Sequence, residues 1–311
     1  MSERRIGLVL SSGGVRGVYA HTGFLLALEG LGISPDALAG CSAGAVVGGV
    51  VASGQPVSAW AEALASVRPR DFWRPRWGAL LWSLLVRQGR GLTGMSSTDA
   101  ARGFTQRQLQ ALTFEACPVP FRALAVHVAT GRKRFFSEGE LLSPMLASAA
   151  IPLLYEPVAI DGEWYCDGAL LDLAPTDAIC CQYGLDVLII HHVAQRQDGN
   201  IALQRAMQRS WTMLELLNLL LYQRRPWYLS EKPLALRQCP CGCGATIVIL
   251  EPELPALDWP VTTSGPAVQE AARQQAVQLL QPCLAALRGE AAFPAGLFET
   301  NPSPSTVEET A

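Results

Sequence analysis

Charged side chains are scarce in this sequence: they make up 16% of its 311 residues, and the formal net charge is only −3. Proteins that bind nucleic acid usually present a strong positive field to the phosphate backbone. This chain has no such excess of positive charge, so we expect no nucleic-acid partner. Half of the residues are hydrophobic, which supplies enough apolar material for the core of a globular protein.

Long apolar runs are also missing. No window offers the roughly 18 uninterrupted apolar residues that a membrane-spanning helix needs. The first apolar run, Ile6 to Leu10, is too short for the core of a signal peptide and meets serines and glycines at once. Nine cysteines, an odd number, suit a reducing compartment better than a secreted disulfide framework. We therefore expect a cytoplasmic protein, soluble or peripheral to a membrane.

Short strand patterns alternate with helical ones along the chain. Ile6 to Leu10 predicts a buried strand, and apolar residues from Val18 then keep helical spacing as far as Gly30. This alternation predicts an α/β fold, a three-layer sandwich with a central, mostly parallel or mixed sheet flanked by helices. Further strands are expected at Ala37 to Cys41, Phe121 to Ala129, Arg132 to Phe136, Val158 to Ile160, Glu163 to Cys166, Leu185 to Val193 and Thr246 to Leu250.

Gly40-Cys41-Ser42-Ala43-Gly44 matches the G-x-S-x-G nucleophile elbow at the point where a strand should turn into a helix. The sharp turn exposes the Ser42 hydroxyl, and Gly40 and Gly44 remove side chains that would clash with neighbouring backbone. The helix after Ser42 would aim its amide groups at a developing oxyanion. An ordinary glycine-rich turn is the competing interpretation, and the pattern alone does not exclude it.

The loop Ser12-Gly13-Gly14-Val15-Arg16-Gly17 directly follows the first predicted strand. Its glycines let backbone amides approach an anion, so the loop is predicted to form an oxyanion hole or a phosphate site. A dinucleotide site fits less well, because Ser12 replaces the first glycine of G-x-G-x-x-G. The second strand also ends without an acidic residue that could hold a ribose.

A serine nucleophile needs a base, and the sequence leaves two kinds of candidate. His191 and His192 follow Ser42 in the order of an α/β-hydrolase triad, but too few strands precede Ser42 for that fold. Asp167 ends an apolar strand, and a partly desolvated carboxylate there could take the proton directly. The spacing of the residues does not decide between these candidates.

With these motifs, the chain resembles the patatin-like phospholipase family, including its bacterial members. The likeness covers Gly7 to Gly54 and then the block Ala147 to Pro152. It continues in Tyr165-Cys166-Asp167-Gly168-Ala169, followed by Pro175 and Asp177. These blocks span roughly the first two thirds of the chain.

The resemblance implies a lipid acyl hydrolase with a Ser42/Asp167 dyad and no catalytic histidine. It places the oxyanion hole at Gly13, Gly14, Val15, Arg16 and Gly17, and Gly168 and Ala169 in the Asp-Gly motif. Arg16 has the family's basic position, with a structural role as an alternative. Ser12 departs from the family pattern, since a glycine is usual there, and a position that required positive φ would be strained by serine. That departure raises a second hypothesis, a catalytically weak lipid-binding or regulatory relative.

We expect a single patatin-like domain over residues 1–296, with core motifs in 5–195, a helical or cap extension in 196–296, and a disordered tail over 297–311. Residues 73–90 and 211–227 combine tryptophan, leucine and arginine. They are predicted to contact a membrane, to form a lid, or to be ordinary core helices. The sequence indicates no oligomeric state.

No cofactor is expected. Cys239-Pro240-Cys241-Gly242-Cys243 could ligate zinc, but no second pair with the usual spacing follows, so no metal site is predicted. The sequence has no calcium-loop pattern either, which favours a calcium-independent enzyme.

Overall fold

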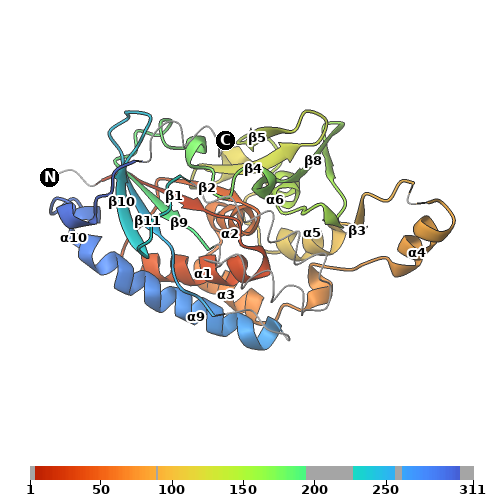
Figure 1. Cartoon of the computed structure of the whole chain (residues 1–311). Coiled ribbons are helices and arrows are strands. Elements are labelled where there is room, and N and C mark those ends of the chain that lie inside the picture. Colours follow the sequence, from red (N-terminus) through yellow and green to blue (C-terminus); the bar gives the residue numbers. More distant parts are fainter. Residues whose placement is uncertain (1–3, 89, 194–226, 256–260, 302–311) are drawn as a thin grey trace.

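The computed structural model describes residues 4–88, 90–193, 227–255 and 261–301 (Figure 1). Its centre is a nine-stranded mixed sheet in the order β10-β11-β9-β1-β2-β4-β8-β7, with β5 paired to β4. The strands are β1 (Ile6–Leu10), β2 (Ala37–Cys41), β4 (Phe121–His127), β5 (Arg132–Phe136), β7 (Val158–Ile160), β8 (Glu163–Asp167), β9 (Val187–His191), β10 (Leu234–Gln238) and β11 (Thr246–Leu250).

The middle of the sheet is parallel, and its edges are antiparallel. β11, β9, β1, β2 and β4 run side by side in one direction, with Leu8 paired to Leu38 on one side and to Ile189 on the other. β10, β5, β8 and β7 pair antiparallel. The central strands are buried along their length, as expected for parallel strands covered on both faces.

One face of the sheet carries a layer of helices, of which α1, α3 and α9 are seen below the strands in Figure 1. α1 packs against α2, α3 and α9, while α6 packs against β4, β7 and β8. Leu8, Leu38 and Ile189 point into this layer and share a core cluster with Phe24 and Trp60. The helices of this layer are α1 (Gly14–Gly30), α2 (Ala43–Ala52), α3 (Val57–Ala65), α6 (Leu142–Ser148) and α9 (Val261–Leu280).

The opposite face is covered, in the part of the chain that the structure describes, by short turns. Val9 and Ile190 on this face pack with Ile179 and Tyr228. Alternate residues of each central strand therefore serve two different cores, as the pleat of a strand requires. The turns are η3 (Gly168–Leu170) and η4 (Thr176–Ala178).

A helical arm extends from the body at the end opposite β10. It carries α4 (Trp77–Leu85), which stands apart from the other helices in Figure 1. A two-stranded sheet, β3 (Gly94–Ser96) with β6 (Leu153–Tyr155), lies at its base, together with η1 (Pro69–Asp71), α5 (Asp99–Gln106) and η2 (Phe114–Ala116). The prediction that residues 73–90 form an ordinary core helix is wrong for α4, because Trp82 is 62% exposed and Leu85 is 80% exposed.

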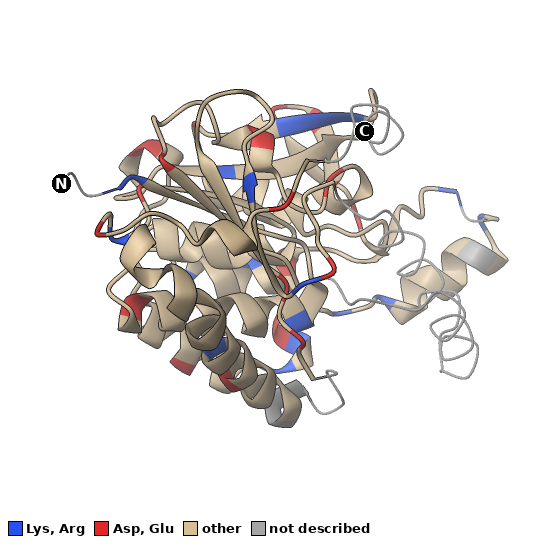
Figure 2. Ribbon diagram, turned by 60° about the vertical axis from the view of Figure 1, so that its left-hand side comes forward, with Lys and Arg blue, Asp and Glu red and all other residues tan. Residues whose placement is uncertain are grey.

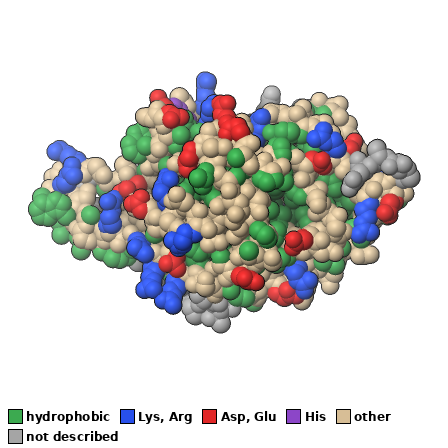
Figure 3. Space-filling view, turned by 180° about the vertical axis from the view of Figure 1, so that it is seen from behind, with side chains coloured by type: hydrophobic (Ala, Val, Ile, Leu, Met, Phe, Trp, Pro, Cys, Tyr) green, Lys and Arg blue, Asp and Glu red, His purple; other side chains and the backbone are tan. Residues whose placement is uncertain are grey.

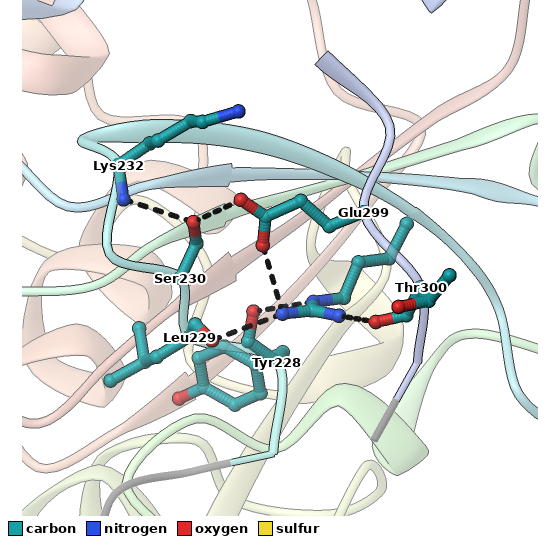
Figure 4. A network of polar contacts seen from close by, with 7 residues as sticks. Tyr228, Leu229, Ser230, Lys232, Glu299 and Thr300 are labelled. Carbon is teal, nitrogen blue, oxygen red and sulfur yellow. Dashed lines mark hydrogen bonds and ion pairs between the residues drawn. The ribbon is translucent and has the colours of Figure 1, made fainter. Parts of the chain in front are cut away.

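The C-terminal segment is fixed to β10 by a buried arginine. The Arg237 guanidinium donates to the carbonyls of Tyr228, Leu229 and Thr300 and pairs with Glu299 at 3.1 Å (Figure 4). Glu299 also accepts a 2.6 Å hydrogen bond from Ser230. The described chain thus continues past the boundary expected at residue 296. This region includes η5 (Gln281–Cys283), α10 (Leu284–Leu287) and η6 (Ala295–Leu297).

Sequence and structure agree closely in the first half of the sheet. β1, β2, β5, β7 and β11 have the expected bounds, and the mixed sheet with flanking helices is confirmed. β7 and β8 form an antiparallel hairpin, and its turn has positive φ at both Asp161 and Gly162. The prediction that α1 begins at Val18 is late, because the helix begins at Gly14, inside the glycine loop.

Candidate active site

Ser42 lies at the sharp turn between β2 and α2, at the carboxyl end of a central strand. Its backbone has φ 53° and ψ −117°, a conformation that costs a non-glycine residue about 1–3 kcal/mol. The Ser42 carbonyl accepts the first helical hydrogen bonds, from Ala45 and Val46. The fold therefore holds this serine in a strained position at the start of a helix.

The glycines beside Ser42 are required by close backbone contacts. A methyl group at Gly44 would lie 2.1 Å from the Leu10 carbonyl oxygen, and one at Gly40 would lie 2.3 Å from the Gly44 carbonyl oxygen. The Gly44 amide also donates to the Ser11 carbonyl at 3.2 Å. The elbow after β2 is thus packed directly against the end of β1, and a side chain at either glycine would push the two apart.

The Ser42 hydroxyl donates a 2.7 Å hydrogen bond to the Asp167 carboxylate. Asp167 ends β8, where it pairs with Ala125 of β4, and its other carboxylate oxygen accepts from the Ala169 amide at 2.8 Å. Both members of the pair are only 2% exposed. Burial raises the pKa of Asp167 to about 7, although the hydrogen bonds from Ala169 and Ser42 act in the opposite direction.

The loop after Asp167 is held by an ion pair. Lys133 of β5 lies 2.6 Å from Asp172 and 3.3 Å from Asp177. Gly168 in this loop packs against the Leu124 carbonyl, so the turn that presents Asp167 rests on β4. The ion pair and the packing of Gly168 together hold the turn that carries the Asp167 carboxylate.

Ser148 is a residue of the site that the sequence did not single out. Its hydroxyl accepts a 2.9 Å hydrogen bond from the Ser42 amide, and the side chain is fully buried at the end of α6. Ala150, two residues later, accepts a hydrogen bond from the Asp167 amide at 3.0 Å. The segment after α6 therefore holds the backbone of both Ser42 and Asp167. The block around Ser148 was part of the family resemblance, but nothing local showed this contact.

The glycine loop ends in the first turn of α1. Its Gly14, Val15 and Arg16 amides are the first of the helix and have no partner inside it, as at every helix start. The Gly17 amide donates to the Gly13 carbonyl at 2.8 Å, so this amide already has a partner inside the helix. A methyl group at Gly17 would lie 2.9 Å from the Ala43 side chain, which brings this turn against the elbow.

Ser12 is not strained. The residue of this loop with left-handed backbone is Gly14, at φ 56°, and Ser12 is not among the residues with positive φ. The Ser12 amide donates to the Leu173 carbonyl at 2.7 Å, and the side chain is buried. Strain at Ser12 was the reason to consider a catalytically weak relative, and the structure shows no such strain.

The Arg16 side chain fastens the loop to the chain behind it. Its guanidinium donates to the carbonyls of Val193, Leu254 and Pro255 at 2.8–3.2 Å. Burial lowers the pKa of Arg16 from its ordinary value. These contacts favour the structural alternative for this side chain over a direct role at the reacting atoms.

Neither His191, which ends β9, nor His192, which follows it, makes the contact that a triad requires. His191 lies 2.8 Å from His21 between the two Nδ1 atoms and stacks on Phe24, while His192 lies 3.1 Å from the Tyr228 hydroxyl. Burial lowers the pKa of His21 to about 4 and that of His191 well below its ordinary value. The Ser42 hydroxyl is already bonded to Asp167, so the geometry does not support a histidine base.

In the described ranges, no helix is long and apolar enough to cross a membrane. Of the second segment expected at a membrane, residues 211–226 lie outside the described residues. Among the described residues, Lys and Arg are interspersed with Asp and Glu over the body of the molecule (Figure 2).

Comparisons with known proteins agree with this architecture. An uncharacterized NTE family protein of Mycobacterium tuberculosis is 34% identical over 176 residues, 56% of this chain and 45% of the relative. Lysophospholipase NTE1 of Cryptococcus neoformans is 27% identical over 187 residues, 60% of this chain and 11% of that protein. The chain therefore spans about half, or less, of the length of these relatives.

Among solved structures, human GIVD cytosolic phospholipase A2 shares the fold, with a TM-score of 0.52 over 92% of this chain and 62% of the human chain, at 10% identity. A family model described as patatin-like phospholipase matches residues 8–179. This range holds more than half of the chain, including the elbow, the glycine loop and Asp167. The chain belongs to the patatin-like phospholipase family.

Proposed function

We propose that this protein is a lipid acyl hydrolase in which Ser42 is the nucleophile and Asp167 is the base. The observation that carries the proposal is the 2.7 Å hydrogen bond between the two buried side chains. A hydroxyl becomes a useful nucleophile when a positioned base takes its proton. The pKa of Asp167, raised to about 7, suits a base that works near neutral pH.

In the proposed reaction, Asp167 accepts the Ser42 proton as Oγ attacks the ester carbonyl. The alcohol then leaves with that proton, and the acyl group stays on Ser42. Asp167 next takes a proton from water, whose hydroxyl displaces the acyl group, and the proton returns to Ser42 as the fatty acid departs. Each proton released by a nucleophile is thus returned to a leaving group.

The amides at the start of α1 and α2 would stabilise the negative charge of the intermediate. Both helices begin at the carboxyl ends of adjacent parallel strands, so their positive dipole ends converge on Ser42. The first-turn donors that have no partner within α1 are the amides of Gly14, Val15 and Arg16. A single well-placed oxyanion donor contributes about 10²–10³ to the rate.

The proposed substrate class is the fatty acyl ester of a phospholipid or lysophospholipid. The family description and the name of the fungal relative support this class, although the fungal match covers a small part of that protein. We therefore expect hydrolysis of acyl chains in aggregated lipid rather than of short soluble esters alone.

Labelling with a fluorophosphonate tests the nucleophile and the base. We expect wild-type protein to be modified on Ser42, Ser42→Ala to be silent, and Asp167→Asn to react about 10²–10⁴ times more slowly. Asp161→Asn, which changes an exposed carboxylate in the β7–β8 turn that does not contact Ser42, is the matched control and should react like wild type. Folded wild-type protein that does not react would overturn the proposal.

We also propose that α4 binds the surface of an anionic lipid bilayer. Apolar side chains are exposed along one helix, and Figure 3 shows hydrophobic and basic side chains together at this end of the molecule, on its left. No acidic residue occurs between Asp71 and Asp99, whereas four arginines do. Apolar anchors next to cations suit a helix lying in the headgroup layer. The exposed apolar residues are Trp77, Leu81, Trp82, Leu85 and Val86, and the arginines are Arg74, Arg76, Arg87 and Arg90.

Vesicle sedimentation tests this surface. Binding to phosphatidylglycerol-containing vesicles should exceed binding to phosphatidylcholine alone and fall with salt. The double variant Trp82→Ser/Leu85→Ser should bind about tenfold less tightly, since each removes apolar area from the bilayer. Trp164→Ser/Leu112→Ser is the matched control, because these residues are similarly exposed but lie elsewhere. Equal loss in both variants would refute a specific role for α4.

A further inference from the structure

Five cysteines from two distant segments meet at one edge of the sheet. Cys239, Cys241 and Cys243 lie in and beside the turn that joins β10 to β11, and Cys180 and Cys181 follow η4. The Cys241 sulfur is 2.9 Å from that of Cys181 and 3.1 Å from that of Cys239, and the Cys180 and Cys181 sulfurs are 3.4 Å apart. The turn that holds Cys239, Cys241 and Cys243 thus contacts Cys181, which lies 60 residues before Cys241 in the sequence.

The cluster is remote from Ser42 in the topology of the sheet. Thr246, which begins β11, pairs with Val187, which in turn pairs with Ile6, so the cluster sits at the amino ends of the parallel strands. Ser42 follows the carboxyl end of β2, which runs parallel to β1. The thiols therefore belong to a separate site.

The exposure of these thiols calls for an explanation. Free cysteine is among the most buried residue types in proteins, yet Cys181, Cys241 and Cys243 are all exposed. Cys239 is buried, and Cys180 packs at the edge of the apolar cluster on this face of the sheet. Gathered sulfur atoms on a surface turn are typical of metal ligation, not of packing.

The distances also suit one metal ion. The sulfur atoms of Cys239, Cys241 and Cys243 lie within 4.8 Å of one another, and so do those of Cys180, Cys181 and Cys241. Four thiolates at a zinc–sulfur distance of about 2.3 Å form a tetrahedron with edges of about 3.8 Å. Small side-chain rotations would bring four of the five thiols to such a tetrahedron.

We propose that Cys181, Cys239, Cys241 and Cys243 bind one zinc ion in a structural site. Cys181 is chosen over Cys180 because its sulfur is the one in direct contact with Cys241 and is exposed. On binding, each thiol loses its proton to solvent and gives a sulfur lone pair to zinc, with no change of oxidation state. A closed set of four thiolates leaves no position for a substrate, so the ion would stabilise the fold rather than react.

Zinc would tie the edge hairpin of the sheet to the segment that follows the Asp167 loop. β10 and β11 form one end of the described sheet, where β10 pairs with β11 on one side and is joined on the other by an isolated bridge from Phe298 to Leu236. Residues 180–181 lie on the face of the sheet where Cys239 is buried, since Cys180 packs against the same apolar cluster as Cys239. A metal cross-link between them would fasten this edge without a disulfide, which suits a reducing compartment.

Metal content of protein purified without chelator, or titrated with zinc under reducing conditions, tests the proposal. Mass spectrometry of the metal should give about one zinc per chain, and cobalt substitution should give the intense thiolate charge-transfer absorption of a tetrahedral site. Cys241→Ser and Cys243→Ser should hold much less zinc, whereas Cys117→Ser, a free cysteine outside the cluster, should keep it.

Folded wild-type protein that takes up no zinc while its thiols stay reactive would overturn the proposal. A Cys181–Cys241 disulfide in a non-reduced peptide map would do the same. If the serine variants do not fold, the zinc content and cobalt spectrum of the wild type still decide the question. Loss of zinc in Cys180→Ser but not in Cys181→Ser would refute the ligand set.

Discussion

The two ends of the parallel strands carry reactive side chains in opposite surroundings. At the carboxyl ends, a hydroxyl and a carboxylate are shielded from water and bonded to each other. At the amino ends, three of five thiols face solvent at a turn. The same sheet therefore presents a dry site for Ser42 and Asp167 and an open one for the cysteines.

This difference in burial gives the side chains at the two ends different chemical properties. Removing water from Asp167 disfavours its charged form and makes it a stronger proton acceptor, at a cost in stability. The thiols of Cys181, Cys241 and Cys243 face water instead, and there they can lose their protons and bind a metal ion. Stability is thus reduced at one end of the strands and, by our proposal, increased at the other.

The largest expected effect comes from Asp167→Asn, which should stabilise the protein while it removes activity. The pKa of Asp167 is raised from 3.8 to about 7, so the folded state disfavours the carboxylate as pH rises through this range. The neutral amide avoids that penalty, by up to about 4 kcal/mol at pH 8, and the gain should vanish near pH 4. Urea unfolding at both pH values measures it, and a variant less stable than wild type at pH 8 would contradict the assigned cause.

A smaller effect should separate two substitutions of Ser42. Both Ser42→Gly and Ser42→Ala remove the hydroxyl, but only glycine relieves the backbone strain at φ 53°. Ser42→Gly should therefore unfold at higher denaturant, with a difference of about 1–2 kcal/mol. Equal stability of the two variants would show that the elbow stores no strain.

The rate of fluorophosphonate labelling should depend on pH through Asp167. The carboxylate is the active form of the base, and its pKa is raised to about 7. The rate should rise about tenfold per pH unit below this value and level off above it. The same profile is expected for Asp161→Asn, whereas a wild-type profile that is flat between about pH 5 and pH 8 would argue against this base.

The smallest effect should be local. Removing zinc with a chelator should speed amide exchange in residues 234–250 by about three- to tenfold, because the edge hairpin loses its cross-link. Residues 37–52 around the elbow should change less, since they lie at the other end of the strands. Hydrogen-exchange mass spectrometry compares both segments in one sample, and uniform protection changes would contradict a local role.

The parts of the site that could be predicted from sequence are those formed by neighbours in the chain. The elbow around Ser42 and the glycine loop are local motifs, and each lies where its strand ends. Asp167 could be named as a candidate, but only the packing of β8 on β4 brings it to Ser42. Ser148 could not be predicted, because its partner is 106 residues away.

Other features were missed for related reasons. β10 contains a buried arginine, which interrupts the apolar pattern of a strand and is satisfied by Glu299 far along the chain. The helical pattern of α4 was correct, but periodicity alone does not say whether an apolar face is covered. The contact between Cys181 and the β10–β11 turn likewise could not be predicted from sequence, because only the fold brings these two segments together.

The position of β1 in the sheet shows that the segment matched by the family model is shorter than the segment needed to complete the fold. The family match ends at residue 179, yet β1 pairs with β9, and β9 with β11, both of which come later in the chain. A fragment of residues 8–179 would contain both Ser42 and Asp167 but would leave one side of β1 as a bare, apolar edge. Such edges invite pairing between molecules, so we expect the fragment to aggregate. The matched segment holds the proposed catalytic pair, whereas we expect its solubility to depend on strands that lie outside the match.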